Sequence, residues 1–180
     1  QLLFVYNLAI FGAVSAASIF GAQYFGKGNH KGHMHSFRFK LYASLTMTAA
    51  AILLFITKGS TLISLYLTDT TGSGATETAL QYGLEYLAIM MIGLIPFAIN
   101  QSYATNIKET GQTMIPMIAS FAAVGINAVL DYILIFGLGP IPKMGVVGAA
   151  LATVIARYIE ASIVIVWAHT NRAKNRYLEG

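Results

Sequence analysis

Long apolar runs alternate with short polar interruptions along the chain. Five of these runs have the roughly 20 residues that a helix needs to cross the hydrocarbon core of a bilayer. Their approximate limits are Leu2 to Phe25, Phe37 to Thr57, Leu84 to Ala104, Ile115 to Gly137 and Val146 to His169. The shorter run from Thr61 to Thr68 is expected to form an extracellular end or an interfacial turn. The pattern predicts an all-α, polytopic membrane protein with about five transmembrane helices.

Two prolines interrupt the helical pattern. Pro96 lies within the third apolar run, and Pro116 lies near the start of the fourth. Each lacks the backbone N–H that an internal turn of helix requires, so each predicts a kink or a helix start. In the last run, Gly148, Ala152 and Ala156 recur every four residues. Small residues at this spacing let a neighbouring helix approach closely, which predicts a packing face.

Composition supports the membrane assignment. The 180 residues are 56% hydrophobic and 10% charged, with a mean hydropathy of +0.65; soluble domains carry about 25% charged residues. No cysteine is present, which excludes disulfides, thiolate metal sites and cysteine nucleophiles. The basic residues behind the net charge of +4 are dispersed among apolar runs, so we expect no nucleic-acid partner. No nucleophile, base and oxyanion-donor set is apparent, so we expect no enzyme activity.

The basic residues separate between the two sides of the predicted membrane. Those near one side are Lys27, Lys31, Arg38, Lys40, Lys108, Arg172, Lys174 and Arg176, and those near the other are Lys58 and Lys143, together with acidic Asp69 and Glu77. Because basic loops favour the cytoplasm, the first run is expected to cross the membrane from the outside to the cytoplasm. The C-terminal tail is then expected to be cytoplasmic. An upstream helix is then expected to be missing. His30, His33 and His35 are expected to be solvated in the first basic loop.

Three ionisable residues fall inside predicted spans: Asp131, Arg157 and Glu160. A charge at the centre of a membrane helix costs about 3 kcal/mol, so each needs a compensating role. Asn127 precedes Asp131 by four residues and therefore shares its helix face. If the last two runs form an antiparallel hairpin, Asp131 lies level with Thr153. The oxygen atoms of Asn127, Asp131 and Thr153 are therefore the candidate site for Na⁺ or H⁺.

A structural interpretation competes with this assignment. Asn127 and Thr153 could bond to neighbouring backbone, with Asp131 neutralised by Arg157, the residue expected level with Asn127. Arg157 and Glu160, three residues apart on one helix, are predicted to form a structural ion pair. Beyond a coupling Na⁺ or H⁺, no metal and no cofactor are expected.

Several short motifs resemble one family of transporters. They are Ala22 to Asn29, Tyr86-Leu87, Gly93 to Pro96, Thr110 to Thr113 with Pro116, Ile126-Asn127 with Leu130-Asp131, Phe136-Gly137 and Gly145 to Thr153. In order and spacing they are similar to helices two to six of the multidrug and toxic-compound extrusion (MATE) family. The resemblance covers nearly the whole chain.

The resemblance implies that residues 1–180 are a partial N-terminal lobe. Members of the family have twelve helices in two six-helix lobes and sit in the plasma membrane. They export drugs and other organic, often cationic, compounds by antiport against Na⁺ or H⁺. The family's N-lobe cation site has an Asp on helix one, and its other members match Asn127, Asp131 and Thr153. The first helix and the second lobe are then the missing partners within the parent chain.

Two other functions are compatible with the residues. A lipid-linked oligosaccharide or polysaccharide exporter of the same superfamily would need an Arg-rich cavity for pyrophosphate, and only Arg157 is deep enough. A truncated membrane protein without transport activity is the other alternative.

Overall fold

The computed structural model describes residues 1–65, 73–138, 142–173 and 175–178, which are mainly helical. The helices are α1 (Leu2–Gly26), α2 (His30–Ser64), α3 (Ser73–Ile92), α4 (Leu94–Glu109), α5 (Met114–Phe136), α6 (Gly145–Thr170) and a short 3₁₀ turn, η1 (Arg176–Leu178). Within the described residues, four helices are long and apolar enough to cross a membrane, and α3 with α4 is a bent pair that counts as a fifth span. The predicted all-α polytopic fold is confirmed.

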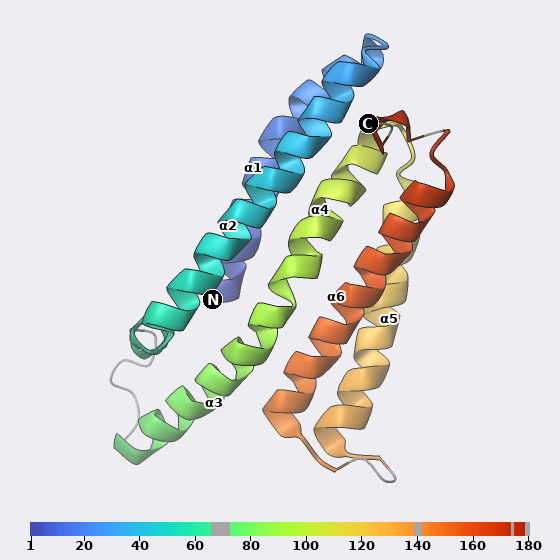
Figure 1. Cartoon of the computed structure of the whole chain (residues 1–180). Coiled ribbons are helices and arrows are strands. Elements are labelled where there is room, and N and C mark those ends of the chain that lie inside the picture. The colour runs from blue at the N-terminus through green and yellow to red at the C-terminus, as the bar shows by residue number, and fades with distance from the viewer. Residues whose placement is uncertain (66–72, 139–141, 174, 179–180) are drawn as a thin grey trace.

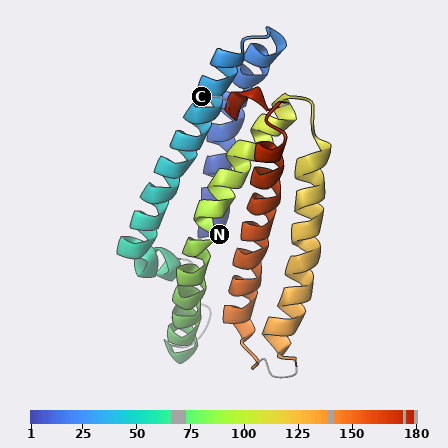
Figure 2. The ribbon, with the colours of Figure 1, turned by 45° about the vertical axis from the view of Figure 1, so that its right-hand side comes forward.

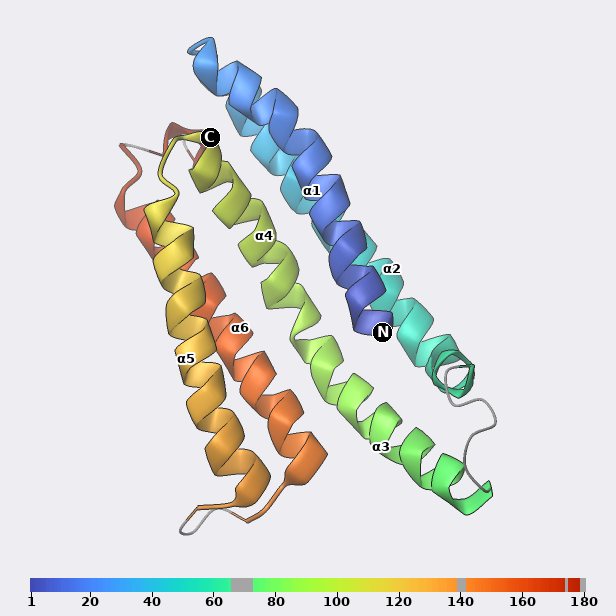
Figure 3. The same cartoon turned by 180° about the vertical axis from the view of Figure 1, so that it is seen from behind.

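Two antiparallel hairpins flank a central bent helix. The pair α1–α2 lies on one side, the pair α5–α6 lies on the other, and α3–α4 runs between them (Figure 1). The view from behind shows the same order (Figure 3). The central helix contacts α1, α2 and α6, so it joins the two hairpins. We call the end of the bundle that carries Lys27, Lys31, Lys108 and Arg172 the basic end.

The turn between α1 and α2 is much tighter than the sequence predicts. Gly28 has a φ of 67°, a conformation that glycine adopts without steric cost, and Asn29 caps α2 by accepting a hydrogen bond from the Gly32 N–H at 2.9 Å. Helix α2 therefore begins at His30, seven residues before the predicted limit, and runs unbroken to Ser64. Residues 61–64 form the end of α2, so of the two predicted alternatives the interfacial turn is wrong there and the helix end holds. Residues 66–68 lie outside the described part of the chain.

The third predicted span is a broken helix. Helix α3 from Glu77 and α4 meet at an angle of 44° around Gly93, which confirms the kink expected from Pro96. Pro96 lacks the N–H that would bond to the Ile92 carbonyl, so the backbone cannot continue straight. Pro116 has the other predicted effect, because it occupies the third position of α5, where a helix does not need its N–H.

Helices α5 and α6 pack through the predicted small-residue face. Gly148 lies so close to the α5 backbone that an added Cβ would come within 2.7 Å of the Leu134 carbonyl carbon and oxygen. The Met144 N–H also donates to the Leu134 carbonyl at 3.0 Å. The hairpin is therefore confirmed, and Gly148 fixes how closely its two helices approach.

We predict that Gly148→Ala lowers the free energy of unfolding by about 1–3 kcal/mol, because the added methyl group meets backbone that cannot move aside. Gly125→Ala on α5 is the matched control, since a Cβ there meets nothing within 4 Å. Thermal unfolding of the purified protein in detergent compares the two. Equal melting temperatures would show that α5 and α6 are not in close contact at Gly148.

Candidate functional site

The predicted cation-site residues lie on the α5–α6 hairpin. Asn127 and Asp131 are one turn apart on α5, and Thr153 is on α6; all three are half-buried. Asp131 Oδ1 and Asn127 Nδ2 are buried without a hydrogen-bond partner among the described residues. Thr153 Oγ1 donates to the Ala149 carbonyl at 3.0 Å, which leaves its lone pairs free to accept or ligate. The hairpin thus carries a carboxylate and an amide that each have an atom without a hydrogen-bond partner.

The register of the hairpin differs slightly from the predicted one. A hairpin in which Asp131 lies level with Thr153 would place Gly148 beside Phe136 and Ser120 beside Val164. Instead Gly148 contacts Leu134, and Ser120 Oγ donates to Glu160 Oε1 at 2.6 Å. The pairing is therefore shifted by two to four residues, which moves Thr153 up to about one turn away from the level of Asp131. The two residues still belong to adjacent helices and adjacent turns.

Arg157 and Glu160 have separate partners. Arg157 Nη1 donates to the Gly93 carbonyl at 3.2 Å, and its guanidinium carbon lies 4.8 Å from the centre of the Phe97 ring. Glu160 accepts the hydrogen bond from Ser120 instead. Within the described residues the predicted ion pair is therefore not formed, because the two side chains turn toward different neighbouring helices. Arg157 also makes no ion pair with Asp131 in that part of the chain.

The carbonyls exposed by the central bend are covered from both hairpins. Arg157 reaches the Gly93 carbonyl, the neighbouring Tyr158 donates to the Ile92 carbonyl at 3.5 Å, and Tyr6 on α1 donates to the Leu94 carbonyl at 3.1 Å. The Ile92 carbonyl lacks its helical donor because Pro96 has no N–H, whereas the Gly93 carbonyl also accepts from the Phe97 N–H at 3.4 Å. A backbone carbonyl without a partner is costly in a membrane interior. The bend is thus a built feature that ties α1 and α6 to the central helix.

A buried ionic cluster at the basic end was missed by the sequence analysis. We define this cluster as His33 and Lys40 on α2 with Asn106 and Glu109 on α4. Lys40 is fully buried, and its Nζ donates to Asn106 Oδ1 at 2.7 Å and to Glu109 Oε1 at 2.5 Å. His33 Nε2 lies 3.1 Å from the other Glu109 oxygen. The prediction of a solvated His33 is wrong, whereas His30 and His35 are exposed, as predicted. Lys40, expected only as one of the basic residues near this side, is buried within α2.

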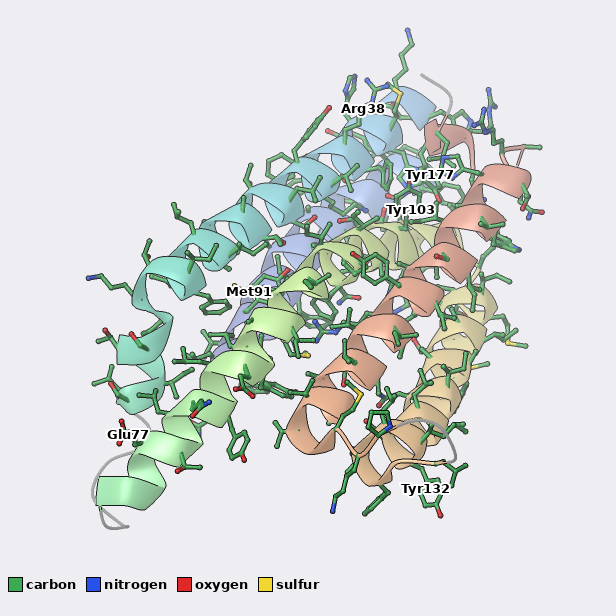
Figure 4. The ribbon with its side chains drawn as sticks, turned by 60° about the horizontal axis from the view of Figure 1, so that its bottom comes forward. Arg38, Glu77, Met91, Tyr103, Tyr132 and Tyr177 are labelled. Atoms are coloured by element: carbon green, nitrogen blue, oxygen red, sulfur yellow. The ribbon has the colours of Figure 1, made fainter. Side chains whose placement is uncertain are left out.

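The chain after α6 folds back over the cluster. The Tyr177 ring of η1 packs against His33, with ring centres 5.4 Å apart, and against Phe37 at 5.0 Å. Burial raises the pKa of the Tyr177 hydroxyl, which keeps it neutral over the physiological range. Figure 4 shows Tyr177 beside Tyr103 at the basic end, with Arg38 nearby and with Tyr132 and Glu77 at the other end. Figure 2 shows η1 against the upper half of α2.

The sequence did hold a signal for this cluster. Lys40, Ser44 and Thr48 recur every four residues on α2, and Ser102 and Asn106 do so on α4. In the structure these stripes face each other, because Lys40 bonds to Asn106 and the Ser44 and Ser102 hydroxyl oxygens are 3.0 Å apart. Thr48 bonds instead to the Tyr6 hydroxyl of α1, at 2.7 Å. Two polar stripes in apolar helices predict interhelical hydrogen bonds.

Comparison with known proteins places the chain in a family. The family model described as MatE matches residues 1–133, about three quarters of the chain. The chain belongs to the MatE family. The resemblance noted in the sequence is thereby confirmed.

Individual MatE relatives match parts of the chain. It is 38% identical over 79 residues to the probable multidrug resistance protein NorM of Thermotoga maritima, which covers 44% of this chain and 17% of that protein. It is 35% identical over 91 residues to the FAD transporter of Shewanella oneidensis, and this match covers 50% of this chain and 20% of the transporter. A NorM of Geobacillus kaustophilus matches over a longer region, 80% of this chain and 30% of the relative, at 25% identity.

A solved structure supports the fold. It is the inward-facing conformation of a multidrug resistance MATE family transporter of the MOP superfamily, which superimposes with a TM-score of 0.80 and 21% sequence identity. The match covers 96% of this chain and 37% of that one. The arrangement of α1 to α6 is therefore a MatE arrangement, and the chain spans at most 37% of the length of the proteins compared with it here.

We predict that Lys40→Met costs about 3–5 kcal/mol of stability, because it leaves the buried Glu109 carboxylate without its cation. The double variant Lys40→Met with Glu109→Gln should be more stable than the single one, since the glutamine is neutral and still bonds to His33. Lys108→Met, an exposed change next to Glu109, is the control. Chemical unfolding measures all three. A double variant less stable than Lys40→Met would contradict a buried charge pair.

Proposed function

We propose that this chain forms most of one six-helix lobe of a transporter that exports organic compounds, often cationic, in exchange for Na⁺ or H⁺. The names of the relatives support an organic substrate, because two of those compared are probable multidrug resistance proteins and one is an FAD transporter. In this proposal the basic end faces the cytoplasm, the C-terminal tail is cytoplasmic and the protein resides in the plasma membrane.

The observation that carries the proposal is the unpartnered Asp131 carboxylate oxygen beside the unpartnered Asn127 amide. A buried polar atom without a partner is costly in an apolar environment, and more so when it is charged. Na⁺ or a proton on Asp131 would remove that cost. Asn127 can offer its carbonyl oxygen after a half-turn of the amide, and Thr153 can add a hydroxyl oxygen. Three oxygen donors of this kind suit a hard monovalent cation or a proton.

Coupling would follow from the position of this site on the hairpin. Thr153 lies one turn before Arg157 on α6, and Arg157 holds the Gly93 carbonyl at the central bend. A cation that draws α5 and α6 together at Asp131 would therefore act on the helix that carries the bend. Ion and substrate need only favour different positions of these helices for exchange to result.

Arg157 argues against the polysaccharide-exporter alternative. That function needs a deep cation available to a pyrophosphate group, whereas Arg157 is engaged with the Gly93 carbonyl and the Phe97 ring. The alternative of a membrane protein without transport activity predicts no cation-driven efflux by the unmodified protein.

We predict that Asp131→Asn in the complete transporter reduces Na⁺- or H⁺-driven efflux of a fluorescent organic cation from proteoliposomes at least tenfold. The asparagine keeps the shape of the side chain but removes the charge that the coupling ion neutralises. Glu160→Gln is the matched control, because it neutralises a carboxylate of the same hairpin that already bonds to Ser120. Normal insertion and melting temperature of the Asp131→Asn protein separate lost coupling from lost folding. Unchanged efflux would remove Asp131 from the ion site.

A further inference from the structure

An apolar groove runs between α1 and α2 near the basic end. Its volume is about 560 Å³. Small side chains line it, among them Ala13 and Ala17 on α1 and Ala43 on α2, and the exposed rings of Phe20 and Phe39 also line it. A groove lined by alanines and two exposed aromatic rings has the polarity of a hydrocarbon chain.

The groove has one closed, polar end. A Cβ added at Gly32 would come within 2.5 Å of the Tyr24 ring, so this ring lies directly against the α2 backbone. Ser36 Oγ donates to the Ala17 carbonyl at 3.1 Å and fastens the two helices beside the groove. His35 is exposed and lines the groove at this end. The glycine therefore has a packing function here, since any larger residue would displace the tyrosine.

Exposed cations surround the closed end. Lys27 is the cap residue directly after α1, three residues beyond Tyr24, and Lys31 lies on α2 one turn before His35. Residues 1–65 contain no Asp or Glu. At the basic end, Glu109 is buried in its contacts with Lys40 and His33. No carboxylate of the described α1–α2 hairpin therefore neutralises these two lysines.

We propose that this groove binds an anionic phospholipid, with an acyl chain along the alanine floor and the phosphate headgroup between Lys27, Lys31 and His35. A neutral lipid would fill the groove equally well but would leave the lysines without a partner. The lysines at one end of the groove favour an anionic headgroup, and the apolar groove beyond them favours an acyl chain. An anionic phospholipid has both parts. Each lysine near a headgroup contributes about 1 kcal/mol, which is about a fivefold preference. This proposal does not depend on what the protein transports.

Site-directed tryptophan fluorescence tests the proposal. The chain has one tryptophan, Trp167, which is replaced by Phe. Phe39→Trp then reports on the groove, and Phe121→Trp on α5, equally exposed but away from the groove, serves as the control. Each protein is reconstituted in phosphatidylcholine vesicles that contain a small fraction of either brominated phosphatidylglycerol or brominated phosphatidylcholine. The ratio of quenching by the two brominated lipids gives the local preference.

We expect phosphatidylglycerol to be favoured at position 39 by fivefold or more and to show little preference at position 121. Changing Lys27 and Lys31 to Gln should abolish the preference at position 39, whereas changing Lys108 and Arg172 to Gln should leave most of it. Equal preference at both positions would overturn the proposal. Absence of quenching at position 39 by either lipid would also overturn it, because another part of the protein would then cover the groove.

Discussion

The bend between α3 and α4 opens the backbone of the central helix where lipid and apolar side chains surround it. Carbonyls at Ile92, Gly93 and Leu94 meet Tyr158, Arg157 and Tyr6, which come from α6 and α1. In water, solvent would satisfy these groups; in a bilayer, only protein atoms can. Pro96 leaves the Ile92 carbonyl without its helical N–H, and the side chains of Tyr158, Arg157 and Tyr6 tie α6 and α1 to the central helix at this point.

A second requirement, that a buried charged side chain have a partner, explains the ionic cluster at the basic end. Lys40 is fully buried, and the contacts with Glu109 and Asn106 compensate for its transfer from water. Glu109 also lies against Gly21 of α1, where even a methyl group would clash with its carboxylate. One charged pair therefore joins α1, α2 and α4, and Tyr177 extends the contact to the chain after α6. The central bend and this cluster hold the first hairpin to the central helix at two depths.

The proposed ion site differs from both of these features. At the bend and in the cluster, the charged groups have partners of good geometry, which is what structural roles require. On α5, the Asp131 carboxylate and Asn127 amide retain unpaired atoms, although both lie in a mostly apolar helix. Arg157, which could have neutralised Asp131, is committed to the Gly93 carbonyl. A buried carboxylate oxygen without a partner is what a site for an exchangeable cation requires.

The sequence by itself determined the membrane class, the approximate spans, a break in the helical pattern at Pro96 and at Pro116, and the packing face around Gly148. These follow from local properties of the chain: the length of an apolar run, the missing backbone N–H of proline and the small size of glycine and alanine. It also placed Asn127 and Asp131 on one face, because four residues are one helical turn. The structure decided that Pro96 kinks a helix and that Pro116 lies at the start of one. Only the tertiary structure decided the partners of Lys40, His33, Arg157 and Glu160. Each of these residues pairs across helices far apart in the chain, and side-chain reach and hairpin register, which no local pattern encodes, select the partner.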